Sequence, residues 1–247
     1  MARCLTIGGS DSSGGAGIEA DLAIFRDAGV AGCTTITALT AQHAGAILRI
    51  SPTTPEQITA SLQATAEAGP VAAIKTGMLA GAAQLHALCD GLARWFADAP
   101  LIVDPVLVAS SGRRLLDGEA LPLLRARLLP RATVITPNLE EAAVLDGEPV
   151  TDPAACARRL ADRFGCTVLL KGGHGDKEEQ VVDRLARPGA PVQAFAFPRR
   201  RLTPVAAHGT GCRYAAAVTA AIARGIAPAE AAPIAHRAAV DGIWRRD

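Results

Sequence analysis

The sequence contains few aromatic residues and carries little net charge. Aromatic side chains make up 3% of the 247 residues and hydrophobic residues 49%, so the core must consist mainly of Ala, Val, Leu and Ile. The formal net charge is +1, with 20% of residues charged. A chain without a strong basic excess has little electrostatic attraction for nucleic acid. The balance favours a small-molecule partner.

The sequence also lacks CxxC pairs and long hydrophobic runs without polar residues. Its six cysteines therefore favour neither a zinc site nor a disulfide framework, and we expect a reducing cytoplasm. The first residues turn acidic too soon for a signal peptide. The uncharged stretch 28–48 contains four threonines as well as Gln42 and His43, so it predicts a buried strand and a loop, with no membrane span.

Short β-rich runs recur along the chain. They cover residues 3–7, 34–39, 71–75, 101–104, 133–136 and 167–170. After the second run the spacing is roughly thirty residues, the length of a βαβ unit. The runs are continuously apolar, which is typical of parallel strands covered on both faces.

The remaining elements complete an α/β pattern. Apolar residues at helical spacing, such as Cys156, Leu160 and Phe164, predict helices between the strands. Residues 180–185 and 192–197 predict an antiparallel pair at one edge, and helices over 209–224 and 228–244 close the chain. We expect one domain over residues 1–247, with a mostly parallel central sheet covered by helices on both faces.

Two glycine-rich segments precede predicted helices. Residues Gly8 to Gly17 follow the first strand, and glycines there allow a ligand to approach the backbone. Their spacing matches neither GxGxxG nor GxxxxGK[ST], so a simple strand-to-helix connection remains the alternative. The second segment, His208 to Cys212, opens an alanine-rich helix.

The second segment is the stronger candidate for chemistry. Backbone N–H groups of residues 209–212 would form an anion hole at the positive end of the helix. The same field would lower the pKa of the Cys212 thiol from its reference of about 8.5. Cys212 is therefore the leading catalytic candidate; the alternative is a small buried hydrophobic residue.

Lysines and oxygen ligands also follow predicted strands. Of 25 basic residues only three are lysine, and Lys75 and Lys171 each close a strand, where a point charge suits phosphate. Asp104 ends one further predicted strand and Asn138 follows another, with Glu141 shortly beyond. Such side chains suit Mg²⁺. Asn138 could equally be a helix cap.

Together these segments resemble the hydroxymethylpyrimidine/phosphomethylpyrimidine kinases of thiamine biosynthesis, in the ribokinase-like superfamily. Motifs in family order span nearly the whole chain. They are TIGGSDSSGGAGIEADL (6–22), TALTAQ (37–42), KTGML (75–79), VDPVLVASSG (103–112), LLPRATVITPNLEEA (128–142), LLKGGH (169–174) and HGTGC (208–212).

The resemblance implies a role for each matched position. Ala16, Asp21 and Gln42 would bind the pyrimidine, and Met78 and Val106 would line its pocket. Asn138, Glu141, Lys171 and Thr210 would bind the nucleotide. Asp104 and Glu141 would hold Mg²⁺. Gly209 and Gly211 would form the anion hole with Lys171 nearby, and Cys212 would be the base.

The implied function is an ATP- and Mg²⁺-dependent kinase that phosphorylates 4-amino-5-hydroxymethyl-2-methylpyrimidine and then its monophosphate. A homodimer is expected from the same resemblance, with no nucleic-acid or membrane partner. Two alternatives are a pyridoxal kinase-like enzyme and a pyrimidine-binding paralogue with little catalysis.

Three departures from the family pattern bear on activity. Glu19 stands where the family typically has Gln, and residues 204–208 replace a polar segment resembling T-x-N-T-H. Arg213 stands where the family usually has Thr. Arg213 could contact the phosphates or obstruct the nucleotide; we expect it to face solvent or to contact phosphate weakly.

Overall fold

The computed structural model describes residues 1–43, 45–108, 112–173 and 179–244. Residues 109–111 and His174, which belong to the motifs above, lie outside the described residues. No described helix is both long and apolar enough to cross a membrane.

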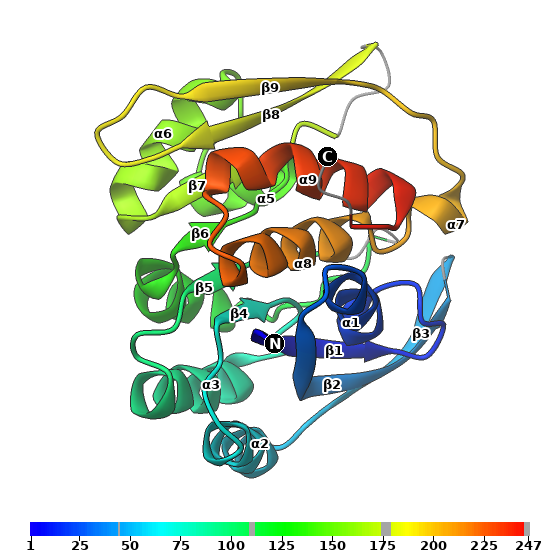
Figure 1. The fold of residues 1–247 in the computed structure, drawn as a ribbon, viewed down its shortest axis with the longest axis vertical. Coiled ribbons are helices and arrows are strands. Elements are labelled where there is room, and N and C mark those ends of the chain that lie inside the picture. The colour runs from blue at the N-terminus through cyan, green and yellow to red at the C-terminus, as the bar shows by residue number, and fades with distance from the viewer. Residues whose placement is uncertain (44, 109–111, 174–178, 245–247) are drawn as a thin grey trace.

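The described strands form one nine-stranded sheet in the order β3-β2-β1-β4-β5-β6-β7-β8-β9 (Figure 1). The strands are β1 (Arg3–Asp11), β2 (Ala31–His43), β3 (Ala46–Pro52), β4 (Ala73–Thr76), β5 (Leu101–Val103), β6 (Val134–Ile135), β7 (Thr167–Leu170), β8 (Gln180–Ala186) and β9 (Gln193–Pro198). Strands β2, β1 and β4 to β7 are parallel. The expected antiparallel pair, β8 and β9, is confirmed at one edge.

The opposite edge differs from the expectation of a loop. Strand β3 pairs antiparallel with β2, from Ala38 with Pro52 to His43 with Ala46. Its residues are half-buried or exposed, so no continuous apolar run marks it as a strand. Residues Gly8 to Asp11, expected in a loop, continue β1 and pair with β2.

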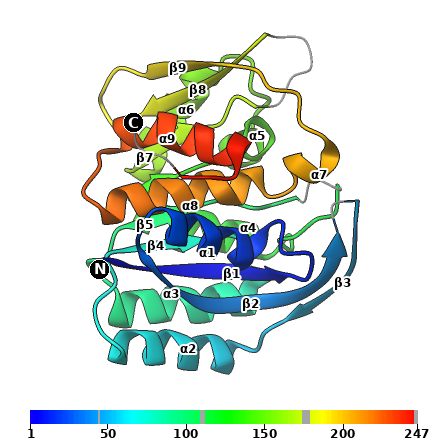
Figure 2. The same ribbon diagram turned by 45° about the vertical axis from the view of Figure 1, so that its right-hand side comes forward.

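Helices cover both faces of the sheet (Figure 2). They are α1 (Gly17–Asp27), α2 (Pro55–Glu67), α3 (Ala82–Trp95), α4 (Ala120–Leu123), α5 (Leu139–Asp146), α6 (Pro153–Phe164), α7 (Pro204–Ala207), α8 (Thr210–Ala223) and α9 (Pro228–Asp241); residues Leu124–Leu128 and Leu129–Arg131 are short π and 3₁₀ turns. The final helix ends at Asp241, earlier than expected, where Gly242 adopts a left-handed conformation (φ 70°).

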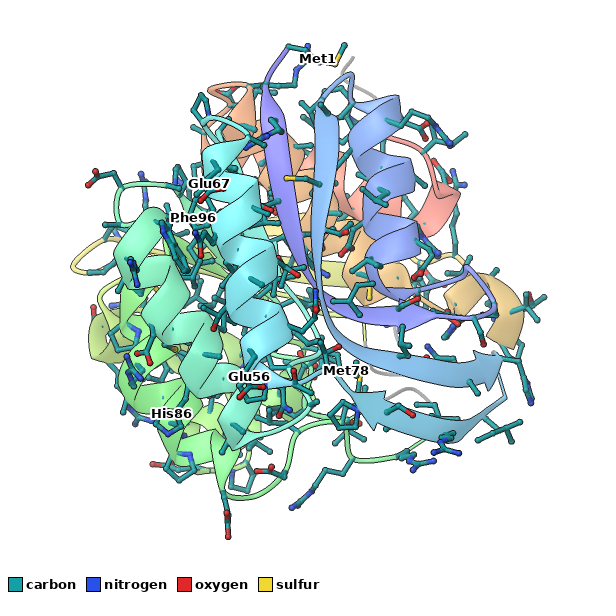
Figure 3. All side chains as sticks on the ribbon, turned by 90° about the horizontal axis from the view of Figure 1, so that it is seen from below. Met1, Glu56, Glu67, Met78, His86 and Phe96 are labelled. Atoms are coloured by element: carbon teal, nitrogen blue, oxygen red, sulfur yellow. The ribbon has the colours of Figure 1, made fainter. Side chains whose placement is uncertain are left out.

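Alternating strand residues divide the core into two layers. Leu5 and Ile7 of β1 pack in a cluster with α2, α3, α5 and α6, whereas Cys4 packs in a cluster with α1, α8 and α9. Figure 3 shows the first layer from outside, where α2 lies beside α3, and Met78 lies near β2 and β3. Because parallel strands run side by side, their carboxyl ends meet at one edge of these layers, where ligands bind in such sheets.

Candidate active site

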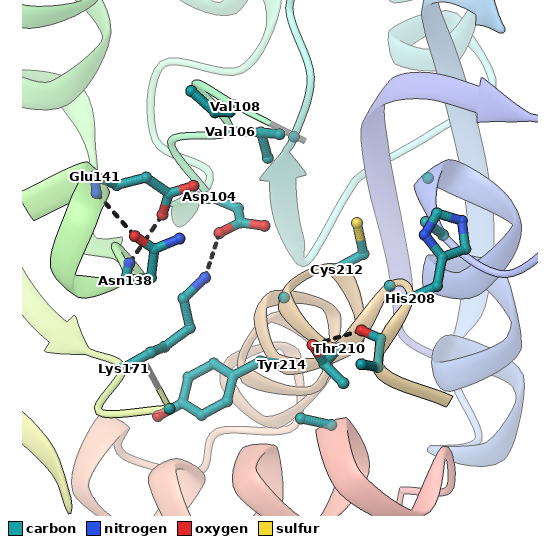
Figure 4. A pocket seen from close by; sticks show the side chains of 18 of the residues that line it. Asp104, Val106, Val108, Asn138, Glu141, Lys171, His208, Thr210, Cys212 and Tyr214 are labelled. Carbon is teal, nitrogen blue, oxygen red and sulfur yellow. Dashed lines mark hydrogen bonds and ion pairs between the residues drawn. The ribbon is translucent and has the colours of Figure 1, made fainter. Parts of the chain in front are cut away.

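A cavity of about 1140 Å³ lies at the carboxyl ends of the parallel strands (Figure 4). It brings together every site residue expected from the sequence except Asp21. The lining includes Ala16, Gln42, Met78, Asp104, Val106, Asn138, Glu141, Lys171, Gly209, Thr210, Gly211 and Cys212. In the strand order β1 and β4 are neighbours, and the chain continues from β1 toward one end of the sheet and from β4 toward the other. Such a switch point is the usual ligand site of an open parallel sheet.

The two glycine-rich segments touch each other beside the cavity. Gly209 has φ +78°, and a Cβ built on it would lie 2.0 Å from the Gly15 carbonyl oxygen. A Cβ on Gly15 would lie 2.6 Å from His208. Only glycine permits both approaches, so the glycines here serve contact between the loops as well as access for a ligand.

Asp11 joins the same two segments by hydrogen bonds. Its Oδ1 accepts from the Ser13 N–H and hydroxyl, and its Oδ2 accepts from the Ala16 N–H and contacts His208 Nε2, all at 2.8 Å. Burial acts to raise the pKa of Asp11, but the bonds from Ser13, His208 and Ala16 lower it overall. Asp11 was missed in the sequence because its partner His208 is 197 positions away.

The second segment forms the start of α8. Gly209 is the N-cap, and the first N–H groups of α8 lie at the positive helix end. The Thr210 hydroxyl donates to the Ala207 carbonyl at 3.0 Å (Figure 4). A Cβ on Gly211 would lie 3.5 Å from Lys171 Nζ, so a lysine ammonium faces this helix start. The arrangement suits a phosphate group.

Lys171 is held by Asp104. The two side chains form an ion pair at 2.9 Å, and Asp104 Oδ1 also accepts from the Thr136 hydroxyl at 3.1 Å. Burial tends to lower the pKa of Lys171, but the Asp104 and Glu141 carboxylates raise it overall. Lys171 therefore stays protonated at neutral pH and supplies a fixed positive charge.

Asn138 and Glu141 cap α5 reciprocally. The Glu141 N–H donates to Asn138 Oδ1, and the Asn138 N–H donates to Glu141 Oε2, both at 2.8 Å. The helix-cap alternative for Asn138 is thus confirmed, yet both residues also line the cavity. Burial raises the pKa of Glu141 to about 7; the Lys171 cation opposes this shift.

Cys212 lies in the first turn of α8 and lines the cavity. Burial raises the pKa of its thiol above the ordinary range, although the Lys75 cation acts to lower it. The expectation of a lowered thiol pKa is therefore wrong, because loss of solvation outweighs the Lys75 cation and the Gly17 hydrogen bond, which act to lower it.

Asp21 is fully buried and does not line the cavity. Its Oδ2 accepts from the Thr6 hydroxyl and from Lys75 Nζ, the latter at 2.8 Å. Lys75, which is 1% exposed, does line the cavity. The structure thus pairs Asp21 with Lys75 and keeps it out of the cavity lining, and its contact with a pyrimidine stays a prediction. The scarcity of lysine was the sequence feature that singled out Lys75.

A second wall of the cavity was not expected from the sequence. It includes Asp183 from β8, Tyr214 from α8 and His236 from α9. The His236 ring stacks on Phe197 at 3.8 Å between ring centres, and its Nδ1 lies 3.7 Å from Asp183 Oδ2. Because these residues come from separate elements without shared spacing, no motif could reveal them.

Arg213 corrects another expectation. The side chain is half-buried and absent from the cavity lining, and its guanidinium donates to backbone carbonyls of the neighbouring segments. It therefore lies against the backbone of the neighbouring segments and outside the cavity lining, which is neither the full exposure to solvent nor the direct contact with a ligand that was expected of it.

Comparison with known proteins identifies the family of this chain. A family model described as phosphomethylpyrimidine kinase matches residues 11–243. The chain belongs to the phosphomethylpyrimidine kinase family. Curated members of this family include the hydroxymethylpyrimidine/phosphomethylpyrimidine kinase of Rhizobium meliloti, 39% identical over 93% of this chain and 86% of the relative. The Streptomyces coelicolor enzyme of the same name is 40% identical over 97% of this chain and 86% of its own length.

Solved structures show the same ribokinase-like fold. A phosphomethylpyrimidine kinase from Clostridium difficile matches 98% of this chain and 99% of its own with a TM-score of 0.83 and 31% identity. A pyridoxal kinase from Staphylococcus aureus, in complex with AMP-PCP and pyridoxal, matches 100% of this chain and 90% of its own with a TM-score of 0.84 and 29% identity. The phosphomethylpyrimidine kinase family thus shares its architecture with pyridoxal kinases.

Proposed function

We propose that this chain is an ATP-dependent kinase of thiamine biosynthesis. It transfers a phosphoryl group to the hydroxymethyl oxygen of 4-amino-5-hydroxymethyl-2-methylpyrimidine and then to the resulting monophosphate. The observation that carries the proposal is the cavity itself, which joins Cys212 and the start of α8 to Lys171 and to the Gly8–Gly17 segment. Family membership supplies the substrate class.

The pyrimidine occupies the end of the cavity formed by Ala16, Gln42, Met78 and Val106. The backbone of Gln42 is fixed by Ser12, whose hydroxyl oxygen accepts from the Gln42 N–H at 2.9 Å. This leaves the side-chain amide of Gln42 to hydrogen-bond the aminopyrimidine edge. Met78 and Val106 supply apolar contacts to the ring, as is usual in small-molecule sites.

The ATP phosphates lie between the start of α8 and the carboxyl end of β7. Backbone N–H groups of Gly209, Thr210 and Gly211 and the Lys171 ammonium would stabilise the charge on the transferring group. Asn138 lies at the cavity wall beside Lys171, with which it forms an isolated β-bridge. Such positioning and charge stabilisation account for most of catalysis in phosphoryl transfer.

The residues present fit a Mg²⁺ ion. No group of three or more His, Cys, Asp or Glu gathers into a metal cluster within the described part of the chain. Mg²⁺, however, is usually held by one or two carboxylates together with water and substrate phosphates. Asp104, whose second oxygen is turned away from Lys171 (Figure 4), and Glu141, which is 7% exposed, would hold it. When bound, the ion would offset negative charge on the phosphates.

Cys212 accepts the proton of the substrate hydroxyl. As that oxygen bonds to the γ-phosphorus, the bond from phosphorus to the β–γ bridging oxygen breaks, ADP leaves, and the proton passes to the thiolate. Lys75 lies close enough to favour the thiolate. We also propose that residues 1–247 form one domain and that the chain acts as a homodimer in the cytoplasm, independently of nucleic acid or membranes.

The test is incubation with Mg-ATP and the hydroxymethylpyrimidine, followed by mass analysis for monophosphate and diphosphate products. Lys171→Ala protein, purified in the same way, controls for contaminating kinases. Preference for pyridoxal under the same conditions would instead identify the pyridoxal kinase-like alternative, which the Staphylococcus aureus neighbours support by fold. Pyrimidine binding without product would identify a binding paralogue.

A further inference from the structure

The three guanidinium nitrogens of Arg213 all donate hydrogen bonds to backbone carbonyls. The bonds run from Nε to Ala239 (3.3 Å), from Nη1 to Gly15 (3.3 Å) and His208 (3.0 Å), and from Nη2 to Ala206 (2.9 Å) and Ala239 (3.3 Å). A guanidinium has five N–H donors, and these bonds account for five. The side chain therefore has no donor left for a phosphate.

The carbonyls that Arg213 contacts are ones that need a partner. Ala206 and Ala239 lie in the last turns of α7 and α9, where helix carbonyls lack intrahelical donors. A cation at a helix C-terminus is also favoured by the helix dipole. Replacing Arg213 by a short side chain would leave the carbonyl of the buried Ala239 without this donor, which is costly, whereas the exposed Ala206 can turn to water.

The other two carbonyls belong to the site. His208 immediately precedes the N-cap of α8, and Gly15 belongs to the segment expected to bind the pyrimidine. Nη1 bonds both of them, next to the point where the Gly209 Cα meets the Gly15 carbonyl. One nitrogen atom thus links the anion hole to the pyrimidine segment, and the side chain that carries it does not line the cavity.

We propose that Arg213 is a positioning residue that fixes the anion hole against the pyrimidine segment and thereby aligns the acceptor hydroxyl with the γ-phosphate. This inference rests on the proposed function, because it names the residue that holds the two parts of that site in register. Arg213 acts through Gly15 and His208, and touches no substrate.

Loss of a positioning residue should lower kcat without weakening the binding of either substrate. Misplacement by about 1 Å can lower the rate by about 100-fold, whereas either substrate alone can still occupy its own part of the cavity. We expect Arg213→Thr to lower kcat by about 10- to 100-fold and to leave the Kd for ATP within a few-fold of wild type. Arg213→Lys, which retains a cation with three donors, should recover part of the rate.

Arg131 provides a matched control. Its Nη2 also donates to two backbone carbonyls, Phe96 at 2.6 Å and Ala99 at 2.9 Å, but it does not line the cavity. Arg131→Thr should lower the Tm by a similar amount and leave kcat unchanged. If Arg131→Thr and Arg213→Thr lower kcat equally, the effect is general destabilisation and the positioning role is wrong.

Hydrogen exchange measured by mass spectrometry tests the link without relying on turnover. In Arg213→Thr, exchange should accelerate in the peptides that cover residues 12–17 and 204–212, and in Arg131→Thr it should not. Unchanged exchange and unchanged kcat in Arg213→Thr would overturn the inference. Wild-type protein that makes no phosphorylated pyrimidine would overturn the proposed function instead, while the exchange result would still stand.

Discussion

At Cys212, the helix start and burial act on the thiol in opposite directions. The N-terminus of α8 and the Lys75 cation favour a thiolate, whereas burial favours the neutral thiol and raises its pKa. Proximity to the transferring group, more than an acidic thiol, therefore makes this residue the candidate base.

Replacing Cys212 tests that assignment directly. A positioned general base typically contributes about 10²- to 10⁴-fold, so Cys212→Ala should lower kcat by that amount. Binding of pyrimidine and ATP should survive, since neither ground state requires proton removal. Cys212→Asp supplies another base and should recover part of the rate. Calorimetric titration and single-turnover assays measure both quantities, and a wild-type rate in the alanine variant would exclude Cys212 as the base.

The raised thiol pKa also predicts the pH dependence of the chemical step. Below its pKa, the thiolate fraction of Cys212 grows about tenfold per pH unit, so the single-turnover rate should rise between pH 7 and pH 9. A carboxylate is already ionised at pH 7, and Cys212→Asp should show a flatter profile over the same range. Equal slopes for the two proteins would show that another group controls the rise.

At the scale of elements, the two glycine-rich segments act as one unit. Asp11 and Arg213 each link them by hydrogen bonds, and Gly15 and Gly209 approach each other closely at the same place. The anion hole therefore depends on the first segment of the chain as well as on α8.

Two alanine substitutions distinguish the effect of backbone strain from the effect of losing the contact between the two segments. Gly209 (φ +78°) and Gly225 (φ +76°) lie at the two ends of α8, but only a Cβ on Gly209 meets the Gly15 carbonyl; nothing lies within 4 Å of one on Gly225. Each left-handed alanine should cost about 1–2 kcal/mol of folding free energy. Gly209→Ala should in addition lose most of its kcat, and Gly225→Ala should retain it. Comparable kcat values for the two variants would show that close contact of the segments is not needed for catalysis.

The sequence predicts those strands and helices whose hydrophobic pattern matches their burial in the structure. Strand β7, Thr167–Leu170, is a continuous apolar run and has the expected bounds. Strand β3 was not expected because its residues are half-exposed and it is formed by pairing with β2. Glycines 8 and 9 suggest a loop, yet β2 supplies partners that extend β1 through them.

The site residues, too, divide into those that a local motif predicts and those that only the fold brings together. Local motifs predict Lys171, Thr210 and Cys212 at the cavity, since each stands at the end of a strand or the start of a helix. Contacts between distant segments are not encoded in local spacing. The Asp11–His208 contact, the bonds of Arg213 and the Asp21–Lys75 ion pair each join segments that lie far apart in the sequence.

At the scale of the molecule, one sheet connects the two core layers. Successive residues of the same strand contribute to opposite layers, as Ile74 and Ala73 of β4 and Val103 and Ile102 of β5 show. Neither layer can lose its packing without exposing the strands of the other. The cavity draws its lining from elements throughout the chain, from the end of β1 to α9.

This sharing of strands predicts cooperative unfolding. Residues 1–247 should melt in one calorimetric transition whose calorimetric and van't Hoff enthalpies agree, as expected for a single domain. Pyrimidine and AMP-PCP, each at 100 times its Kd, should each stabilise the native state by about 2.7 kcal/mol. For a chain of this size that corresponds to about 5–10 °C in Tm for each ligand. Because the cavity spans both halves of the chain, the ligands should move the whole transition at fixed protein concentration. Two separate transitions, with only one shifted by ligand, would show instead that the sheet is divided between two folding units.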